Sequence, residues 1–321
     1  MHIETIAVLN ESTEGLSTRG YADALREKLP DVDVTWCNTR TVEREATRTA
    51  DVITGISVER DIIENAKQIE LFAATSSGVD HLPLPLFRRR EIFLTNASGI
   101  HAPGIAEQVL GYILLFARNI HRGIYQKMDS EWRHYQASEL KGSTVTILGL
   151  GAIGTAVATR LESFDVQTIG IRYTPSKGGP TDQVCGLDSE SLDSALWETD
   201  YLVVCSPLTE ETDDLIDEHR LETLPPNAVI INVGRGPIVN TEALVNALKT
   251  NSIRGAALDV TDPEPLPNQH DLWDLKNVII TPHMGGHTPK HWDRMADIVK
   301  RNVIELNKGD ESPELENRVD I

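Results

Sequence analysis

Three side chains with complementary chemistry each follow an apolar run in the last third of the chain. Arg235 stands between two glycines, Glu264 lies in a proline-rich segment, and His283 precedes a glycine pair. An arginine can hold a carboxylate through a two-pronged contact, and a histidine can donate a proton to a carbonyl oxygen. A carboxylate bonded to the second ring nitrogen fixes the tautomer of the histidine and favours its charged form. Beside a hydride donor, these three side chains could reduce the carbonyl group of a small acid.

A glycine-rich motif predicts where that hydride donor binds. The apolar run Thr144–Leu148 predicts a buried strand, and a helical pattern over Thr155–Leu161 follows the glycines. The first glycine permits a tight turn, the second lets the backbone approach a pyrophosphate, and the third lets helix and strand pack closely. The helix start adds free N–H groups and a positive dipole end. A purely structural turn is the alternative, but the strand–helix context favours a dinucleotide site. Its residues are Gly149, Leu150, Gly151, Ala152, Ile153 and Gly154.

The identity of the dinucleotide depends on Arg172, which follows the next expected strand, Val166–Ile171, 23 residues after Gly149. An acidic residue near this spacing usually accepts a hydrogen bond from the ribose 2′-hydroxyl. An arginine cannot accept that bond, but it can pair with a 2′-phosphate. Lys177 lies nearby. We therefore predict that NADP(H) is preferred and NAD(H) is possible, with a solvated loop charge as the alternative for Arg172.

Six apolar runs predict the strands that position these segments, the number expected of a doubly wound dinucleotide fold. They are Thr144–Leu148, Val166–Ile171, Tyr201–Cys205, Ala228–Val233, Gly255–Val260 and Val278–Thr281. Ligands of such sheets bind beyond the carboxyl ends of the strands. Arg235, Glu264 and His283 are therefore expected at one edge of this sheet.

The first hundred residues predict a second, smaller sheet, because apolar runs alternate with amphipathic helical patterns. The expected strands are Thr5–Leu9, Asp33–Trp36, Asp51–Thr54, Glu70–Ala74 and Ile92–Thr95, and the expected helices are Gly20–Leu29, Thr41–Thr49 and Ser57–Ala66. A last helix, around Trp292–Leu306, could return to this domain, and the charged tail after it is expected to be irregular. The predicted fold class is α/β with two doubly wound parallel-sheet domains. A Rossmann-type coenzyme domain, 100–287, is inserted into a smaller flavodoxin-like substrate-binding domain, 1–99 and 288–321.

A long helix is expected over Ile105–Tyr125, because its apolar residues recur at spacings of three and four. Such a helix could bridge two domains or face a partner subunit. A plain core helix is the equally weighted alternative.

The formal net charge of -19 comes from 49 acidic and 30 basic residues, of which only ten are lysine. A surface of this sign argues against nucleic-acid binding. It repels itself at ordinary salt and is screened at high salt, so we hypothesise adaptation to molar salt. An ordinary acidic cytoplasmic enzyme is the alternative. The absence of a signal peptide or membrane-length apolar run favours a cytoplasmic protein. Three widely spaced cysteines favour neither disulfides nor a metal site.

Six ordered stretches resemble the D-isomer-specific 2-hydroxyacid dehydrogenase family over nearly the whole chain. They are Ser76–Asp80, Asn96–Glu107, Gly149–Gly154, Asn232–Asn240, Leu258–Pro265 and Thr281–Gly286. The family's formate dehydrogenases carry glutamine where Glu264 stands, and its long phosphoglycerate dehydrogenases carry a regulatory domain that this length does not fit. Arg172 departs from the family's usual acidic residue. Family members are generally dimers, joined largely through the helix that matches Ile105–Tyr125, so a homodimer is expected.

The resemblance implies a role for each site residue. Arg235 would anchor the substrate carboxylate, His283 would be the general acid and base, and Glu264 would be its partner. The turn formed by Ser76, Ser77 and Gly78 would donate backbone N–H groups to the substrate, and Asp259 would lie near the nicotinamide carboxamide. Besides the glycine motif, the expected coenzyme contacts are Arg172, Tyr173, Thr174, Ser206, Pro207, Thr212, Val233, Asp259, His283 and Gly285.

The sequence therefore predicts a reversible reductase of 2-ketoacids to D-2-hydroxyacids. A glyoxylate or hydroxypyruvate reductase would use the same three side chains and is the alternative within this class. A dinucleotide-sensing protein resembling the family's transcriptional corepressors is the alternative from another class. No metal, nucleic acid or membrane partner is expected.

Overall fold

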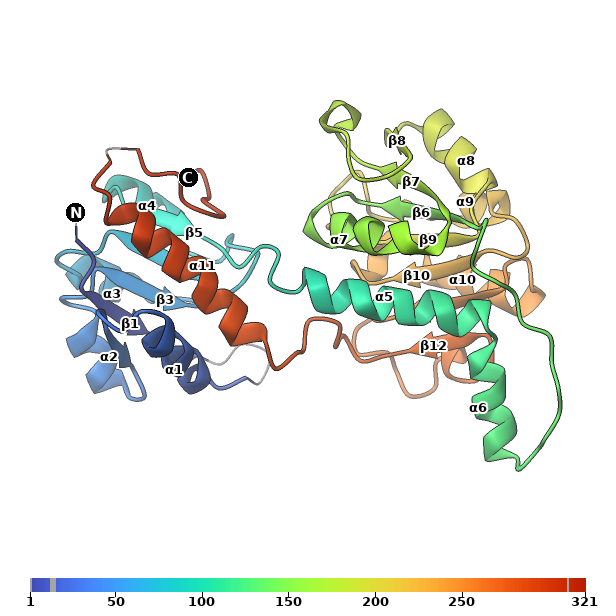
Figure 1. Ribbon diagram of the computed structural model, residues 1–321, viewed down its shortest axis with the longest axis horizontal. Coiled ribbons are helices and arrows are strands. Elements are labelled where there is room, and N and C mark those ends of the chain that lie inside the picture. The colour runs from blue at the N-terminus through green and yellow to red at the C-terminus, as the bar shows by residue number, and fades with distance from the viewer. Residues whose placement is uncertain (1, 12–15, 311) are drawn as a thin grey trace. The chain divides into compact units, whose positions relative to one another are not determined.

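The computed structural model describes residues 2–11, 16–310 and 312–321, and the chain forms two compact units. The first unit comprises residues 1–100 and 288–321, and the second comprises residues 101–287. Each unit has its own parallel sheet with helices on both faces (Figure 1). The expected fold class, two parallel-sheet α/β domains, is confirmed. Within the described ranges, no helix is both long and apolar enough to span a membrane.

The sheet of the first unit has five strands in the order β2-β1-β3-β4-β5, which is the flavodoxin-like order. They are β1 (Thr5–Val8), β2 (Asp33–Trp36), β3 (Val52–Gly55), β4 (Leu71–Ala74) and β5 (Phe93–Thr95). Every residue of β3 and β4 is buried, as expected for strands covered on both faces. The ends of all five strands agree with the expected ones to within one residue.

Two layers of helices cover this sheet. One face packs against α1 (Thr18–Lys28) and α11 (His291–Leu306), and the other packs against α2 (Arg40–Ala46), α3 (Arg60–Asn65) and α4 (Leu84–Arg89). Tyr21 of α1 and Trp292 of α11 stack with their ring centroids 5.0 Å apart. The last helix therefore belongs to the first unit, as the sequence suggested. The tail after it is irregular but attached, because the Val319 N–H donates to the Leu94 carbonyl oxygen at 2.8 Å.

The sheet of the second unit has seven parallel strands in the order β12-β11-β10-β9-β6-β7-β8. They are β6 (Thr144–Leu148), β7 (Gln167–Ile171), β8 (Gln183–Cys185), β9 (Tyr201–Val204), β10 (Val229–Asn232), β11 (Gly255–Leu258) and β12 (Val278–Ile280). The expected number of six was too small, because β8 was missed. That strand has only three residues, all at least partly exposed, so it leaves no apolar run in the sequence.

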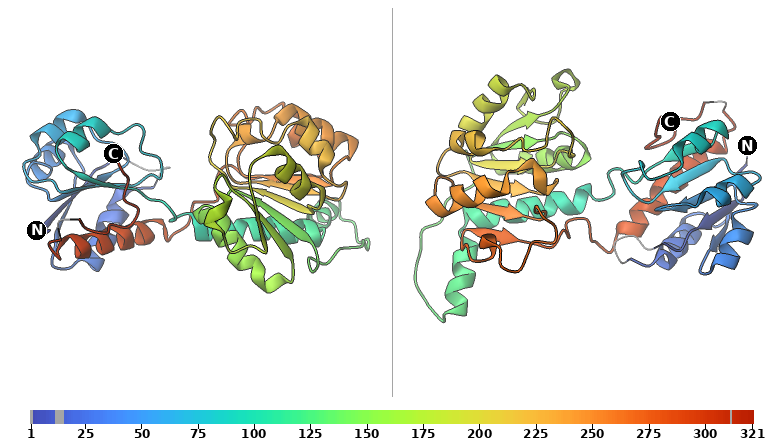
Figure 2. Two further views of the ribbon diagram at one scale, coloured as in Figure 1. Left: turned by 90° about the horizontal axis from the view of Figure 1, so that it is seen from above. Right: turned by 180° about the vertical axis from the view of Figure 1, so that it is seen from behind.

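Helices cover both faces of this sheet as well (Figure 2). One face packs against α5 (Ala102–Ala117) and α7 (Ala152–Leu161), and the other against α8 (Ser189–Trp197), α9 (Glu218–Thr223) and α10 (Thr241–Thr250). Asp188, Asp217 and Asn240 cap α8, α9 and α10 by accepting a backbone N–H of the first turn. Short 3-10 turns are η1 (Glu162–Phe164), η2 (Pro175–Lys177), η3 (Gly236–Ile238) and η4 (Asp271–Trp273).

The long helix expected over Ile105–Tyr125 is two helices, and that prediction was wrong. Helix α5 ends at Ala117, and α6 spans Ile120–Met128. Between them Asn119 has a left-handed backbone with φ of 52°, a conformation that asparagine tolerates. The apolar spacing continues across this break, so the pattern alone could not reveal it. Val109 and Ile113 are fully buried in α5, whereas Ile120 and Ile124 are 46% and 49% exposed in α6.

Candidate active site

The glycine motif lies where the strand order of the second sheet reverses, between β6 and β9. A Cβ on Gly149 would lie 2.7 Å from the Ser206 backbone nitrogen, so this loop touches the loop after β9. A Cβ on Gly154 would lie 2.0 Å from the Gly149 carbonyl oxygen, so helix α7 touches its own entry loop. At Gly151, by contrast, a Cβ would meet nothing within 4 Å. The first and third glycines are required by the fold, and the second leaves open space.

That open space fits the pyrophosphate of a dinucleotide. Gly151 is the N-cap of α7, no side chain caps the helix, and no acidic residue lies in its first turn. The backbone N–H groups of the first turn are thus available to an anion at the positive end of the helix dipole. The residues present therefore fit the pyrophosphate of a dinucleotide coenzyme.

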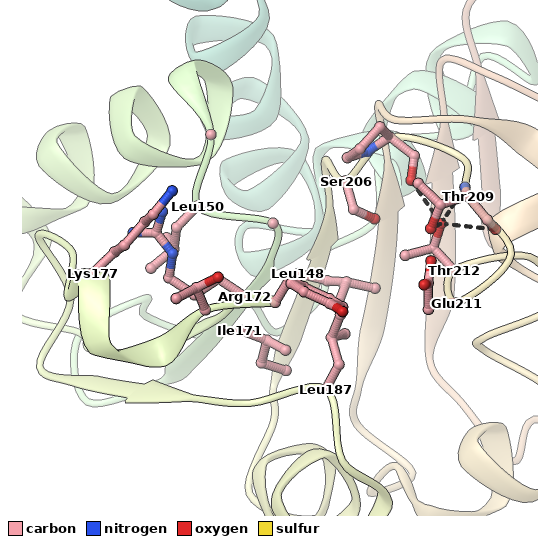
Figure 3. A pocket seen from close by; sticks show the side chains of 15 residues that line it. Leu148, Leu150, Ile171, Arg172, Lys177, Leu187, Ser206, Thr209, Glu211 and Thr212 are labelled. Atoms are coloured by element: carbon pink, nitrogen blue, oxygen red, sulfur yellow. Dashed lines mark hydrogen bonds between the residues drawn. The ribbon is translucent and has the colours of Figure 1, made fainter.

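A cavity of about 490 Å³ adjoins the glycine loop (Figure 3). Many of the expected coenzyme contacts line it, namely Gly149, Leu150, Gly151, Arg172, Tyr173, Thr174, Ser206, Pro207 and Thr212. Leu148, Leu187, Thr209 and Glu211 also line it and were not predicted, because no chemical signal marks them in the sequence. Of the remaining glycine-motif residues, Ala152 and Ile153 form the first turn of α7.

Arg172 and Lys177 lie together on one side of this cavity, and Glu211 lies on the other (Figure 3). The Arg172 Nη1 donates to the Gly178 carbonyl oxygen at 2.5 Å, which holds the guanidinium over the turn after β7. Lys177 is exposed. Its positive charge adds to that of Arg172 on the side of the cavity that is formed by the segment after β7.

The loop after β9 is held by its own hydrogen bonds. The Thr212 hydroxyl donates to the Pro207 carbonyl oxygen at 2.7 Å and accepts from the Thr209 N–H at 2.8 Å. Thr212 is buried, so its first role is to shape the loop that carries Ser206 and Pro207. Below the loop, the Cys205 thiol donates to the Gly149 carbonyl oxygen at 3.2 Å, and burial raises the pKa of this thiol to about 12.

Arg235, Glu264 and His283 follow three neighbouring strands. Strands β10, β11 and β12 pair in parallel, so the segments after them leave the same edge of the sheet. A Cβ on Gly236 would lie 2.1 Å from the Thr261 carbonyl oxygen, which shows how closely the loops after β10 and β11 approach. Arg235 is exposed, and its Nη1 donates to the Gly234 carbonyl oxygen at 2.8 Å.

The His283 ring is paired with Glu264. The His283 Nδ1 lies 2.6 Å from the Glu264 Oε1, and both side chains remain partly open to solvent. This contact leaves Nε2 as the ring nitrogen that a substrate can reach. A cavity of about 650 Å³ borders the pair and is lined also by Trp273.

Asp259 lies directly under the loop that carries His283. Its side chain is buried, with only 4% of the residue exposed. The N–H groups of His283, Met284 and Gly285 donate to the Asp259 carbonyl oxygen, Oδ1 and Oδ2 at 2.8, 3.1 and 2.9 Å. These bonds hold His283 in a left-handed backbone conformation, with φ of 50°. Val233, the remaining expected contact, is buried directly after β10.

The expected substrate turn belongs to the first unit. Ser76, Ser77 and Gly78 follow the carboxyl end of β4, and Ser77 and Gly78 are exposed. The Ser76 hydroxyl donates to the Gly78 carbonyl oxygen at 2.7 Å, and the Asn96 amide donates to the Ser77 carbonyl oxygen at 2.8 Å. The turn is thus held in shape with its backbone toward solvent.

Sequence reasoning missed a set of polar side chains behind this site. Gln108 and Tyr112 of α5 contact Thr281 and Asp259. Nothing in the local sequence marks them, because their partners lie far along the chain. Among the residues that the structure describes, no group of three or more His, Cys, Asp or Glu side chains could hold a metal ion.

Comparison with known proteins finds a matching family model and similar sequences. Residues 110–285 match the model of the D-isomer specific 2-hydroxyacid dehydrogenase, NAD binding domain. A glyoxylate reductase of Thermofilum pendens is 37% identical over 268 residues, covering 81% of this chain and 78% of that protein. A glyoxylate reductase of Pyrococcus furiosus is 32% identical over 270 residues, covering 81% of this chain and 80% of that protein.

Solved structures show the same architecture. The TT0316 protein of Thermus thermophilus is 31% identical, with a TM-score of 0.72 over 98% of this chain and 99% of that one. A D-isomer specific 2-hydroxyacid dehydrogenase family protein of Aeromonas salmonicida is 29% identical, with a TM-score of 0.78 over 99% of both chains.

The fold and the site define a nicotinamide-dependent oxidoreductase with two parallel-sheet domains. The chain belongs to the D-isomer specific 2-hydroxyacid dehydrogenase family. Its coenzyme is a nicotinamide dinucleotide, and its chemistry is the reduction of small ketoacids, as the resemblance implied.

Two glycine variants should separate the coenzyme role of the loop from its structural role. We expect Gly151→Ala to weaken coenzyme binding while leaving stability unchanged, because its Cβ enters open space. We expect Gly154→Ala to lower the free energy of unfolding by about 1–3 kcal/mol, because its Cβ overpacks against the Gly149 carbonyl. Urea unfolding and coenzyme fluorescence titration measure the two effects. Unchanged coenzyme affinity in Gly151→Ala would contradict the pyrophosphate assignment.

Proposed function

We propose that the protein reversibly reduces 2-ketocarboxylic acids to D-2-hydroxyacids, with His283 as general acid and base. The observation that carries the proposal is the 2.6 Å contact between His283 Nδ1 and Glu264 Oε1 at the strand edge that also carries Arg235. When bound, the coenzyme supplies the hydride. His283 donates a proton from Nε2 to the carbonyl oxygen during reduction and takes it back during oxidation.

The other side chains bind and orient the substrate. The exposed guanidinium of Arg235 binds the substrate carboxylate and polarises the neighbouring carbonyl group. Glu264 fixes the tautomer and the orientation of the His283 ring. The turn at Ser76, Ser77 and Gly78 adds backbone N–H donors for the carboxylate. We assign residues 1–99 and 288–321 to substrate binding and residues 100–287 to dinucleotide binding.

Glyoxylate or hydroxypyruvate reduction is the second candidate. The names of the relatives from Thermofilum pendens and Pyrococcus furiosus favour it. The same three side chains would carry out the reaction. These enzyme names favour catalysis over the alternative of a dinucleotide-sensing corepressor.

We propose NADP(H) as the preferred coenzyme. Arg172 and Lys177 put two positive charges on the side of the cavity that follows β7, where a ribose 2′-phosphate would lie. Both can donate to a phosphate, and neither can accept from a 2′-hydroxyl. NAD(H) remains a possible second coenzyme.

We also propose a homodimer that uses the 105–125 segment, with α6 as its main contact. Ile120, Ile124 and Met128 are exposed at a spacing of four residues along α6, and the exposed Trp132 follows the helix, so a second copy of the chain would bury an apolar surface. Sedimentation equilibrium measures the state directly. The formal charge of -19 supports a separate proposal, that the protein works at molar salt.

A substrate panel tests the reaction and the salt requirement together. Initial rates with NADPH and NADH should be measured on glyoxylate, hydroxypyruvate and pyruvate at low and molar KCl. We expect turnover of these acids to rise with salt, because screening relieves repulsion between surface carboxylates. Reduction of glyoxylate gives glycolate, which is achiral. The D-configuration must therefore be determined on the glycerate formed from hydroxypyruvate or the lactate formed from pyruvate. Full activity and an unchanged melting temperature without salt would contradict the halophilic proposal.

Replacing the proposed acid and base should separate chemistry from binding. We expect His283→Ala to lower kcat by roughly 10²–10⁴-fold while coenzyme still binds, because general acid–base catalysis is removed. Glu264→Gln keeps a hydrogen-bond acceptor and should lose less. Stopped-flow rates and coenzyme titration measure the two properties, and near-normal turnover in His283→Ala would refute the assigned role.

Reversing the charge of Arg172 should change coenzyme preference. We expect Arg172→Asp to raise the KM for NADPH by roughly 10–100-fold, the effect of losing one charge-assisted hydrogen bond, with little loss for NADH. Lys276→Asp is a matched control, because it makes the same charge change at the amino end of β12. Equal use of both coenzymes before and after the change would count against the 2′-phosphate site.

A further inference from the structure

A buried set of polar side chains joins helix α5 to the loop that carries His283. We infer that Gln108 and Tyr112 are positioning residues of the reaction, because they hold Asp259 and Thr281 and thereby the His283 loop. This inference rests on the proposed role of His283. It assigns a catalytic purpose to a helix whose other buried side chains belong to the core.

The contacts converge on the Asp259 carboxylate. Gln108 Nε2 lies 2.8 Å from Asp259 Oδ1 and 3.0 Å from Thr281 Oγ1. Tyr112 Oη lies 2.5 Å from both Gln108 Nε2 and Thr281 Oγ1, and Thr281 Oγ1 bonds Asp259 Oδ1. Gln108 and Tyr112 are four residues apart, so they project from the same face of α5.

The donors and acceptors in this set can be assigned by starting from the Asp259 carboxylate, which accepts hydrogen bonds. The Asp259 carboxylate already accepts the N–H groups of Met284 and Gly285, so Thr281 must donate its single proton to it. Thr281 can then only accept from Tyr112, and Tyr112, having donated its proton, can only accept from Gln108. The two amide protons of Gln108 serve Tyr112 and Asp259. The reversed amide would place its oxygen against the carboxylate, so Nε2 is the amide atom that faces Asp259.

Burial keeps these bonds in place. Tyr112 is 5% exposed and Asp259 is 4% exposed. Burial is the main cause that raises the pKa of Tyr112, so its hydroxyl stays protonated and remains a donor. Gly285 lies against the same helix, since a Cβ there would be 3.1 Å from Ile105 Cγ1 and 3.3 Å from Gln108 Oε1. The end of the His283 loop is therefore seated on α5.

The purpose of this seating follows from the backbone of His283. The left-handed conformation at φ of 50° is unfavourable for a histidine, and three N–H bonds to Asp259 maintain it. If Asp259 were free to turn, the loop would relax and His283 would lose its alignment with Glu264. Misalignment of an acid lowers kcat more than it weakens binding.

The test uses hydroxyl deletions with a matched control. Tyr112→Phe and Thr281→Val each remove one hydroxyl of the set, and Thr281→Ser restores it. Tyr21→Phe is the control, because Tyr21 is fully buried in the first unit and its hydroxyl also bonds a threonine, Thr54 Oγ1, at 3.0 Å. For each variant, kcat, KM, coenzyme affinity and urea unfolding are measured.

We expect Tyr112→Phe and Thr281→Val to lower kcat about 10-fold, with coenzyme affinity within about twofold of the parent. Thr281→Ser and Tyr21→Phe should keep the parental kcat. The double variant Tyr112→Phe/Thr281→Val should lose less than the product of the two single losses, because the Tyr112–Thr281 bond is removed in both single variants. Gln108→Met keeps the side-chain volume but removes both donors, so it should lower kcat as Tyr112→Phe does. It replaces Tyr112→Phe in the test if that variant does not fold.

Two outcomes distinguish this inference from the function on which it rests. If His283→Ala keeps its turnover, the proposed acid and base is wrong. If His283→Ala is inactive but Tyr112→Phe, Thr281→Val and Gln108→Met keep the parental kcat and lose only stability, as Tyr21→Phe does, the set is structural and the inference is overturned.

Discussion

The parallel direction of β10, β11 and β12 is the constraint on which the site depends. Parallel strands release the chain at one edge of the sheet, so the segments that carry residues 235, 264 and 283 leave from the same edge although 48 positions separate the first from the last. The loops are then pressed together, since the Gly236 backbone lies against the Thr261 carbonyl with no room for a side chain. The parallel pairing of the three strands therefore places these residues at one edge of the sheet, independently of the contacts that their side chains make.

At the opposite edges of the sheets, where the strands begin, carboxylates accept hydrogen bonds that stabilise the fold. Asp51 Oδ2 accepts the backbone N–H groups of Glu4 and Thr5 where β1 begins, at 2.9 and 2.8 Å. Asp200 Oδ2 accepts the Thr144 N–H at the start of β6, at 2.8 Å. Hydrogen bonds from Thr168 likewise hold the pKa of Asp182 below its usual value. Carboxylates therefore secure the amino ends of strands in both units, which leaves the carboxyl ends for the loops that bind ligands.

The sequence predicted those features that close backbone approach or continuous burial imposes. Gly149 and Gly154 are required because no side chain fits there, and strands such as β6 and β10 are recognisable because every position is buried. The short, half-exposed β8 leaves no such pattern. The break at Asn119 was missed because the apolar spacing passes through it while the surroundings change from core to solvent. Gln108 was missed because its carboxylate partner is 151 positions away and local pattern carries no information on such a contact.

The contacts that orient His283 all lie within one unit. The His283–Glu264 pair, Arg235, Asp259 and the bonds from α5 all belong to residues 101–287. The His101 Nδ1 lies 3.2 Å from the Gly286 carbonyl oxygen, so the start of this unit is tied to the end of the His283 loop. The proposed acid and base, His283, is therefore oriented by contacts within the second unit. Groups that are aligned before the substrate binds reduce the entropy cost of reaction.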